Sequence, residues 1–352
     1  MNLKKIIATI ALGVTMFACK TTTQEPVATS ATDVIVINEG NFNSADGSLS
    51  TYRSGDAGVE LGVFERINGF PIGATIQNVY AEPSQNRMYV ITNSPDKLEM
   101  INYNTFSSLA TIRNSGTTIN FTNPYAFAGI GLTAYISNWG TYNSTTFAFE
   151  NGYISKINLS NNSVTKIART AQPQDLKVVN NNLYIANTSG TSISVLNTNN
   201  DASIAEITTP AGADKMVVDK NNKIWVLCTS GNLIRINPVS NTIEATFSSV
   251  PVSGYNEKMV LNAAKDKLYW LNASFGQPSK IFTMDITATT IPTTAFITRN
   301  NIYGLGVHPN GDVYVTDSNS FTGNGRVYVY SSTGTEKTNF GAGRGPNGFI
   351  FR

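Results

Sequence analysis

Short apolar segments of one kind recur along most of the chain. A typical copy opens with an aromatic residue, continues with two apolar or small residues and closes with a small polar residue. Six copies fit this description and a seventh, near the start, lacks the aromatic; they occupy residues 35–38, 89–92, 135–138, 184–187, 225–228, 269–272 and 314–317. The spacing is roughly 45 residues, so the pattern predicts a repeated β-unit.

Each copy lies inside a longer unit. A preceding strand ends in a turn, as in residues 305–309 followed by Asn310-Gly311, a pair that supplies the positive φ of tight hairpins. A third strand follows, such as residues 193–196, and then a short fourth, such as residues 204–207. Seven units of four strands predict an all-β fold, a seven-bladed β-propeller with four-stranded blades.

The two ends of this region complement each other. Residues 345–352 resemble a first strand with no second strand behind it, and residues 33–38 resemble a second strand with no first. Pairing of these N- and C-terminal strands would close the ring and leave no exposed sheet edge.

The residues before the repeats predict export and lipidation. Residues 1–18 are expected to be a lipoprotein signal peptide, because Lys4 and Lys5 precede an apolar stretch too short to span a bilayer. Ala18-Cys19 resembles a bacterial lipobox, which implies acylation of Cys19; an ordinary leader with a chance cysteine is the alternative. Residues 19–32 are expected to be a polar tether and residues 33–352 a single propeller. The chain would then be anchored to the outer membrane, in either leaflet.

Composition narrows the function classes. Charged residues make up 14% of the chain, and without the two leader lysines the basic residues equal the 23 acidic ones. This balance argues against a nucleic-acid partner. One His and two Cys argue against a usual zinc site. No cofactor is expected, and a monomer is predicted.

Aromatic residues gather in the loops of one predicted face. In a propeller, the loops after second strands share a face with the loops that join blades. The aromatic residues of these loops lie beside Asn and Gln in the sequence, a combination that suits a bulky ligand with flat and polar parts. Packing of the aromatic side chains on the rim of the propeller is the alternative. The candidate ligand-binding residues are Phe42, Tyr125, Trp139, Tyr142, Tyr255, Phe275, Tyr303 and Phe321.

Charged residues are expected where first strands begin, around the channel mouth. Lys215 and Lys258 occupy equivalent places in adjacent units and are candidates for binding an anionic group; a solvated charge pair is the alternative. Asn78, Asp175 and Asn347 are expected at the same level.

The repeat resembles the YVTN/YncE-like seven-bladed propellers, most closely where Tyr-Ile-Ala-Asn at residues 184–187 is followed by Ile-Ser-Val-Leu at 193–196. Residues 37–42 and 47–52, behind a lipobox, are similar to surface lipoprotein propellers that partner TonB-dependent outer-membrane transporters. Some of those proteins bind cobalamin. The resemblance implies a non-enzymatic protein that captures a nutrient or cofactor, corrinoid-like, for a transporter.

Two other functions remain open. One is a protein- or glycan-binding adhesion module that uses the same face. The other is a metal-dependent lactonase, for which Glu39, Asn187 and Asp317 are candidate ligands, although a general preference for polar strand ends explains them equally well. His308 is expected in a turn on the opposite face, and Cys228 is expected to be buried.

Overall fold

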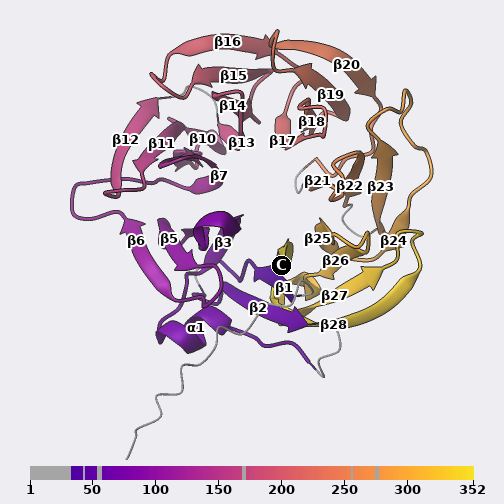
Figure 1. The fold of residues 1–352 in the computed structure, drawn as a ribbon, viewed down its shortest axis with the longest axis horizontal. Coiled ribbons are helices and arrows are strands. Elements are labelled where there is room, and N and C mark those ends of the chain that lie inside the picture. Colours follow the sequence, from indigo (N-terminus) through magenta and orange to yellow (C-terminus); the bar gives the residue numbers. More distant parts are fainter. Residues whose placement is uncertain (1–32, 43, 54–57, 169–171, 255–256, 274–276) are drawn as a thin grey trace, which may run out of the picture.

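The computed structural model describes residues 33–42, 44–53, 58–168, 172–254, 257–273 and 277–352. Seven antiparallel sheets stand in a ring around a central opening, as Figure 1 shows. Each recurring segment of the sequence forms the second strand of a different sheet. The predicted all-β, seven-bladed propeller is therefore confirmed.

Six blades have four strands, ordered from the central opening outwards. Blade 2 contains β3 (Thr75–Glu82), β4 (Arg87–Asn93), β5 (Lys97–Asn102) and β6 (Ser108–Arg113). Blade 3 contains β7 (Pro124–Ile130), β8 (Thr133–Asn138), β11 (Tyr153–Asn158) and β12 (Ser163–Ala168). Blade 4 contains β13 (Pro173–Val179), β14 (Asn182–Asn187), β15 (Ser192–Asn197) and β16 (Ser203–Thr208). Blade 5 contains β17 (Ala213–Val218), β18 (Ile224–Cys228), β19 (Asn232–Asn237) and β20 (Thr242–Ser248). Blade 6 contains β21 (Met259–Leu261), β22 (Lys267–Asn272), β23 (Ser279–Asp285) and β24 (Ile297–Arg299). Blade 7 contains β25 (Ile302–Val307), β26 (Val313–Asp317), β27 (Asn324–Tyr330) and β28 (Glu336–Arg344).

Blade 1 is built from both ends of the propeller. Its strands are β29 (Pro346–Phe351), β1 (Asp33–Asn38) and β2 (Ser48–Arg53). The C-terminal β29 pairs antiparallel with β1, with Val34 opposite Phe351. The fourth strand is reduced to a single bridge between Thr51 and Glu60. The predicted closure is thus confirmed, with a shorter outer edge in this blade.

The recurring aromatic joins neighbouring blades. Tyr184 is fully buried in an apolar cluster that contains Val195 from its own blade and Met216 from blade 5. Its hydroxyl donates a hydrogen bond of 2.6 Å to Oδ1 of Asn241, which lies in the turn between β19 and β20 of blade 5. A blade alone has little core, so its stability depends on burying such faces against the next blade.

The small polar residue that closes each segment also has a structural role. Asn138 is fully buried, and its Nδ2 donates to Ser155 Oγ at 2.9 Å. Its Oδ1 accepts a hydrogen bond from the Thr122 backbone N–H at 2.9 Å. Asn38 makes the equivalent contacts, donating to Ser50 Oγ and accepting from the Gly343 N–H. These asparagines hold the chain where it enters the innermost strand.

We expect Asn138→Ala to lower the free energy of unfolding by about 2–4 kcal/mol. The change leaves the half-buried Thr122 N–H without its acceptor and removes the donor to Ser155 Oγ, which keeps only its own bond to the Asn120 carbonyl. Urea unfolding measures this change. Asn161→Ala, on an exposed turn of the same blade, is the control and should change it little. Equal stability of the two variants would contradict the role given to Asn138.

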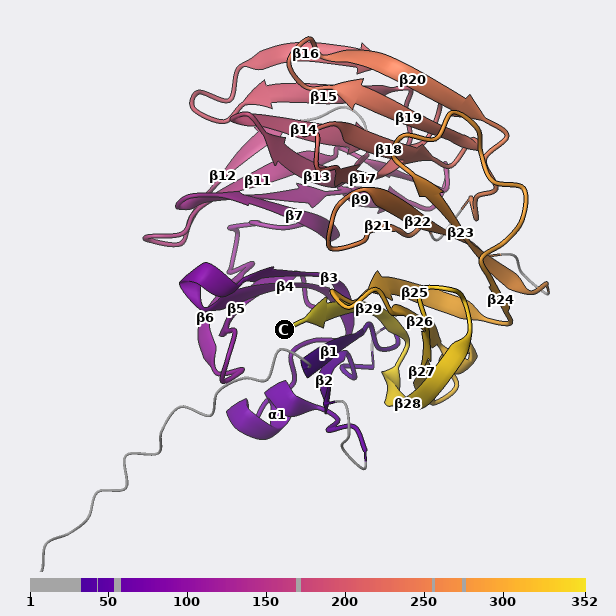
Figure 2. The same ribbon diagram turned by 45° about the vertical axis from the view of Figure 1, so that its right-hand side comes forward.

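Several elements were not predicted. The helix α1 (Val63–Asn68) lies outside blade 1 beside β2 and buries Val63 and Phe64 (Figure 2). The strands β9 (Thr141–Asn143) and β10 (Ala148–Glu150) form a hairpin between β8 and β11. Two short 3-10 turns complete the structure, η1 (Pro83–Gln85) and η2 (Asn319–Phe321). In the described ranges no helix has the length and apolar character needed to cross a membrane.

Candidate functional site at the channel mouth

Six of the seven innermost strands carry a β-bulge near their first residues. The pairing register shifts by one residue in β3, β7, β13, β17, β25 and β29. A bulge redirects the side chains beside it and is frequent next to functional sites. The repeated bulges therefore mark the start of the innermost strands as the candidate site.

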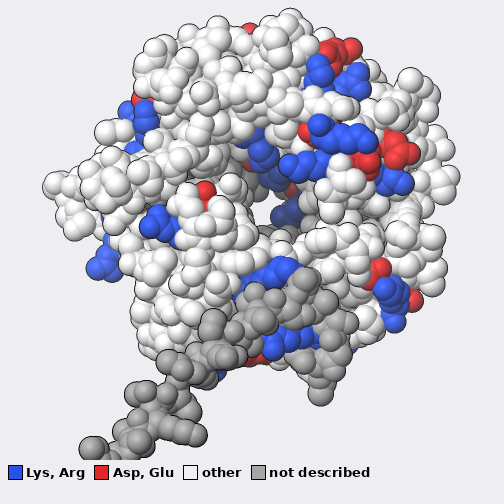
Figure 3. All heavy atoms as spheres, viewed as in Figure 1, with Lys and Arg blue, Asp and Glu red and all other residues white. Residues whose placement is uncertain are grey.

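The side chains at this level form what we call the mouth layer. Its members come one from each blade and are Gln77, Tyr125, Asp175, Lys215, Lys258, Tyr303 and Asn347. All except Tyr303 line a cavity of about 410 Å³, together with Asn78. Basic side chains surround the opening at the centre of the ring in Figure 3, and the lysines that line the cavity are Lys177, Lys215 and Lys258.

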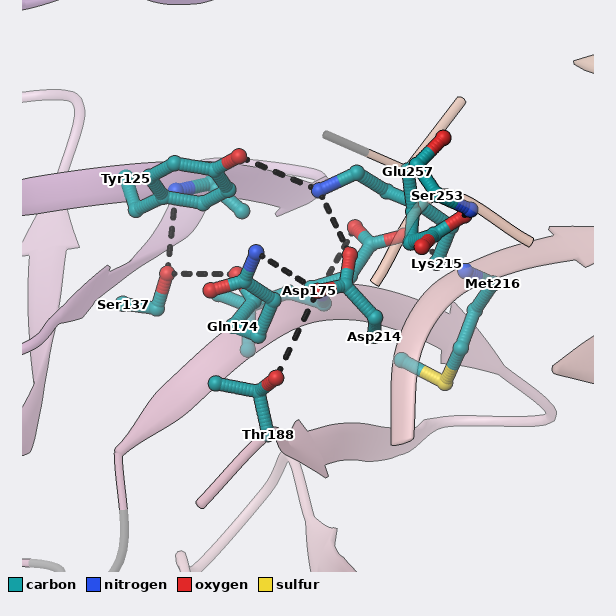
Figure 4. Close-up of polar contacts among 12 residues, drawn as sticks. Tyr125, Ser137, Gln174, Asp175, Thr188, Asp214, Lys215, Met216, Ser253 and Glu257 are labelled. Carbon is teal, nitrogen blue, oxygen red and sulfur yellow. Dashed lines mark hydrogen bonds and ion pairs between the residues drawn. The ribbon is translucent and has the colours of Figure 1, made fainter. Parts of the chain in front are cut away.

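Lys215 is held by groups of the protein itself (Figure 4). Its Nζ lies 2.9 Å from Asp214 Oδ1 and donates to the Tyr125 hydroxyl at 3.1 Å. The same Asp214 accepts from Gln174 Nε2 at 3.1 Å through its other oxygen. Burial on its own would lower the pKa of Lys215, but Asp214, Tyr125 and Asp175 together outweigh it and raise that pKa. Lys215 is therefore a fixed and largely neutralised cation.

Lys258 is in a different position. Within the described residues no carboxylate lies within ion-pairing distance of its Nζ, which sits 5.6 Å from the centre of the Tyr303 ring. Burial and the nearby charge of Lys215 lower the pKa of Lys258 to about 8, and the carboxylates of Glu39 and Asp214 offset them only in part. An anion beside Nζ would supply the missing partner.

Glu257 precedes Lys258 in the chain but contacts the loop instead. It is buried, and its Oε1 accepts from the Gly254 N–H at 2.5 Å, while its Oε2 accepts from the Ser253 N–H at 3.4 Å. Burial raises the pKa of Glu257 to about 7, because these two hydrogen bonds compensate for desolvation only in part. Glu257 positions the loop that carries Lys258.

Two predicted aromatic residues reach the mouth layer, and each has a second one against it. Trp139 stacks on Tyr125 with ring centres 4.7 Å apart. Phe321 meets Tyr303 edge to face at 5.1 Å. The Tyr303 hydroxyl donates to Glu39 Oε2 at 2.6 Å. The structure thus brings Tyr125, Lys215, Lys258 and Tyr303 together, with Trp139 and Phe321 behind them.

The other predicted aromatics are dispersed. Phe42 is exposed in the loop after β1, and Tyr142 is exposed on β9 against Phe149. Tyr255 and Phe275 lie outside the described residues, as do Cys19 and the predicted signal peptide and tether. Phe42 and Tyr142 do not line the cavity at the mouth.

The candidate lactonase residues make separate contacts. Glu39 accepts from Tyr303 and from Asn347 Nδ2, Asn187 donates to Ser194 Oγ, and Asp317 accepts from the Asn319 N–H. Among the described residues no group of three or more His, Cys, Asp or Glu is arranged to hold a metal ion.

The remaining predictions for single residues hold. His308 lies in a turn at the far end of β25, where Asn310 donates its backbone N–H to Nδ1. Cys228 is buried and forms no disulfide, and burial raises the pKa of its thiol to about 12.

Sequence reasoning missed several residues of the site, among them Gln77, Lys177, Asp214 and Glu257. Asp214 is the extra residue of the β17 bulge, and a bulge has no reliable signature in a strand of this kind. Lys177 lies two residues after Asp175 on the same side of β13 and donates to Asp175 Oδ1 at 2.8 Å. The alternation of side chains along a strand could have identified Lys177 from Asp175.

Fold and site together define a β-propeller with a cavity at one end of its channel that both polar and apolar side chains line. Residues 33–342 match the model of a domain of unknown function, DUF5074, and the chain belongs to this family. None of the curated proteins matches the sequence.

Solved structures with the same fold include three from bacteria. The periplasmic gluconolactonase of Pseudomonas aeruginosa shares 12% identity at a TM-score of 0.66, covering 91% of this chain and 98% of that one. A quinonprotein alcohol dehydrogenase-like protein from Bacteroides thetaiotaomicron shares 14% identity at a TM-score of 0.67, covering 91% of this chain and 78% of that one. Hydrazine synthase of Kuenenia stuttgartiensis shares 12% identity at a TM-score of 0.60, covering 80% of this chain and 92% of that one. At such identities the likeness shows the fold alone.

Proposed function

We propose that this protein captures an anionic small molecule at the channel mouth, as a lipid-anchored, non-enzymatic binding protein of the bacterial envelope. The observation that carries the proposal is Lys258, a cation in a cavity of about 410 Å³ with no described carboxylate partner. Lys258 is half-buried, and a partly desolvated charge without a partner is costly, so its presence beside an open cavity favours a ligand that neutralises it.

The rest of the mouth layer supports binding. Asn347 and Gln77 offer amides that orient a polar ligand, and the stacked Tyr125 and Trp139 offer a rigid wall. A rigid site loses little conformational entropy when a ligand binds.

Calorimetric titration with 1-naphthalenesulfonate, inorganic phosphate and a corrinoid tests this proposal. At least one anion should bind, and Lys258→Met should weaken it by about 10- to 100-fold, the usual cost of losing a charge-assisted hydrogen bond. Lys280→Met, at an exposed lysine of the same blade, is the matched control. Failure of every anion to bind, or equal affinity for the Lys258 and Lys280 variants, would overturn the proposal.

The anchor and the partner complete the proposal. Acylation of Cys19 would hold the propeller at the outer membrane, and a TonB-dependent transporter would receive the ligand, a corrinoid-like molecule. A pull-down from detergent-solubilised outer membranes should recover a transporter barrel. Recovery of a different protein or of a glycan would favour the adhesion function instead.

Lipidation gives a prediction of its own. The wild-type protein should fractionate entirely with membranes, whereas Cys19→Ser should appear in the soluble fraction, because two or more acyl chains give stable anchoring. Cell fractionation with immunodetection measures this. Membrane retention of the Cys19 variant would contradict the anchor.

Hydrolysis of a lactone is a second candidate, favoured by one observation. The pKa of Lys258, about 8, places a proton-transferring group in the cavity near neutral pH. Turnover of gluconolactone that is lost in Lys258→Met and kept in Lys280→Met would establish this activity.

A further inference from the structure

We infer that the channel takes an amphipathic anion, with its acidic group in the mouth layer beside Lys258 and its apolar part directed down the channel. The inference rests on the proposed function and specifies its ligand class. It comes from the side chains that line the channel one step below the mouth layer.

This second level, which we call the inner layer, is apolar on six of the seven strands. Each member follows a mouth-layer residue by two positions, which places it about 7 Å further along the strand. The apolar members are Val79, Val217, Val260, Leu305 and Phe349, which line the cavity at the mouth, and Phe127, which lines a second cavity. Phe127 and Leu305 are largely buried between blades, so the other four offer most of the apolar surface. Lys177 is the seventh member, and Asp175 of the layer above neutralises it at 2.8 Å.

One cavity reaches both layers. The residues around it include Lys258 and Asn347 from the mouth layer, and Val217, Val260 and Phe349 from the inner layer. The side chains of these last three are only half-buried, so they present apolar surface to the cavity. Burial of that surface by a ligand would be favourable.

A second cavity extends the apolar region. It measures about 250 Å³ and shares Asn78, Asp175 and Lys177 with the first. Its wall includes Tyr80 and Phe127, which stack with ring centres 4.8 Å apart. A flat or extended apolar group that reaches beyond the inner layer would therefore contact the wall of this second cavity.

The charges place the acidic group at the mouth. Lys215 and Lys177 each have a carboxylate partner, Asp214 and Asp175 respectively, whereas Lys258 has none among the described residues. The groups around Lys258 are Lys215, Glu39, Asp214 and the Tyr303 ring, and neither of these two carboxylates forms an ion pair with its Nζ. An anion whose acidic group binds Lys258 in the mouth layer would place its apolar tail against the apolar side chains of the inner layer.

Calorimetric titration of the full chain with three matched probes tests this inference. 1-Naphthalenesulfonate carries both parts, methanesulfonate only the acidic group, and 1-naphthalenemethanol only the rings. We expect the first to bind at least about tenfold more tightly than either of the others. 1-Naphthoate and 1-naphthyl phosphate then identify which acidic group is preferred.

A double variant tests the inner layer directly. Val217→Thr with Val260→Thr keeps side-chain shape and should weaken 1-naphthalenesulfonate binding by about three- to tenfold, without changing methanesulfonate binding. Val239→Thr, at a residue that is 83% exposed, is the control, and the thermal midpoints verify folding.

The outcomes separate the two proposals. Methanesulfonate binding as tightly as 1-naphthalenesulfonate would overturn the amphipathic ligand and leave anion capture standing. Equal binding of 1-naphthalenemethanol would show an apolar site and overturn both. Unchanged binding by the double variant would overturn the role of the inner layer.

Discussion

Replacement of Lys258 by Met should make the protein more stable, whereas the same replacement of Lys215 should make it less stable. Both lysines line one cavity, but only Lys215 has an ion-pair partner among the described residues. Methionine keeps the unbranched shape of the chain and removes the charge. The opposite signs follow from this difference in partners.

The gain in stability expected for Lys258→Met follows from the pKa of Lys258, about 8, which is below the ordinary 10.5. In the unfolded chain Lys258 holds its proton up to a higher pH, so the folded state is penalised for the charge below pH 8. Stability is gained as the pH rises from about 8 to 10.5, and the penalty disappears above that range. At pH 7 we expect Lys258→Met to raise the free energy of unfolding by about 1–2 kcal/mol, after allowance for its partial exposure.

The loss of stability expected for Lys215→Met follows from its ion-pair partner Asp214, which is 7% exposed. Without the lysine, a buried carboxylate retains only polar partners such as Gln174. We expect a loss of about 2–4 kcal/mol. Urea unfolding of both variants at pH 7 measures the difference, and the Lys280→Met variant should resemble the wild type. Destabilisation of equal size in both lysine variants would contradict the assignment of roles.

Deletion of residues 346–352 should abolish cooperative folding. β29 supplies the innermost strand of blade 1, and Phe349 and Phe351 pack against Val34 and Val36 of β1. Removing β29 exposes the edge of β1 and the apolar faces on both sides of it, which favours aggregation. We expect no single thermal transition and recovery mainly in the insoluble fraction.

A peptide of residues 346–352 added during refolding provides the control. If β29 acts by strand pairing, the peptide should restore a cooperative transition, because an added strand can complete an open sheet. A scrambled peptide should not. A truncated chain with the thermal midpoint of the full chain would show that the ring does not depend on this closure.

The repeated strands could be predicted from the sequence because their pattern is set by burial. Residues such as Tyr184 recur since every blade needs a large side chain against the next one. The ends of the ring could also be matched, because β29 and β1 each lacked a partner that the other supplied.

The site was less accessible to sequence reasoning. Lys215 and Lys258 read alike in the sequence, and only the bulge that brings Asp214 beside Lys215 distinguishes them. Loop aromatics were equally ambiguous. Tyr125 lines the cavity and stacks on Trp139, whereas Tyr142 does not line it and packs on Phe149. Such contacts depend on three-dimensional placement, which spacing along the chain does not specify.

The most direct test of the account is the affinity for 1-naphthalenesulfonate measured from pH 7.5 to 9.5. The sulfonate keeps its charge throughout, and Glu257, with a pKa of about 7, is largely ionised at the start. If protonated Lys258 binds the anion, the affinity should fall about tenfold per pH unit above pH 8, and Lys258→Met should show a weak, flat profile. Wild-type affinity that stays constant across this range and is matched by the Lys258→Met variant would show that Lys258 is not the group that binds the anion.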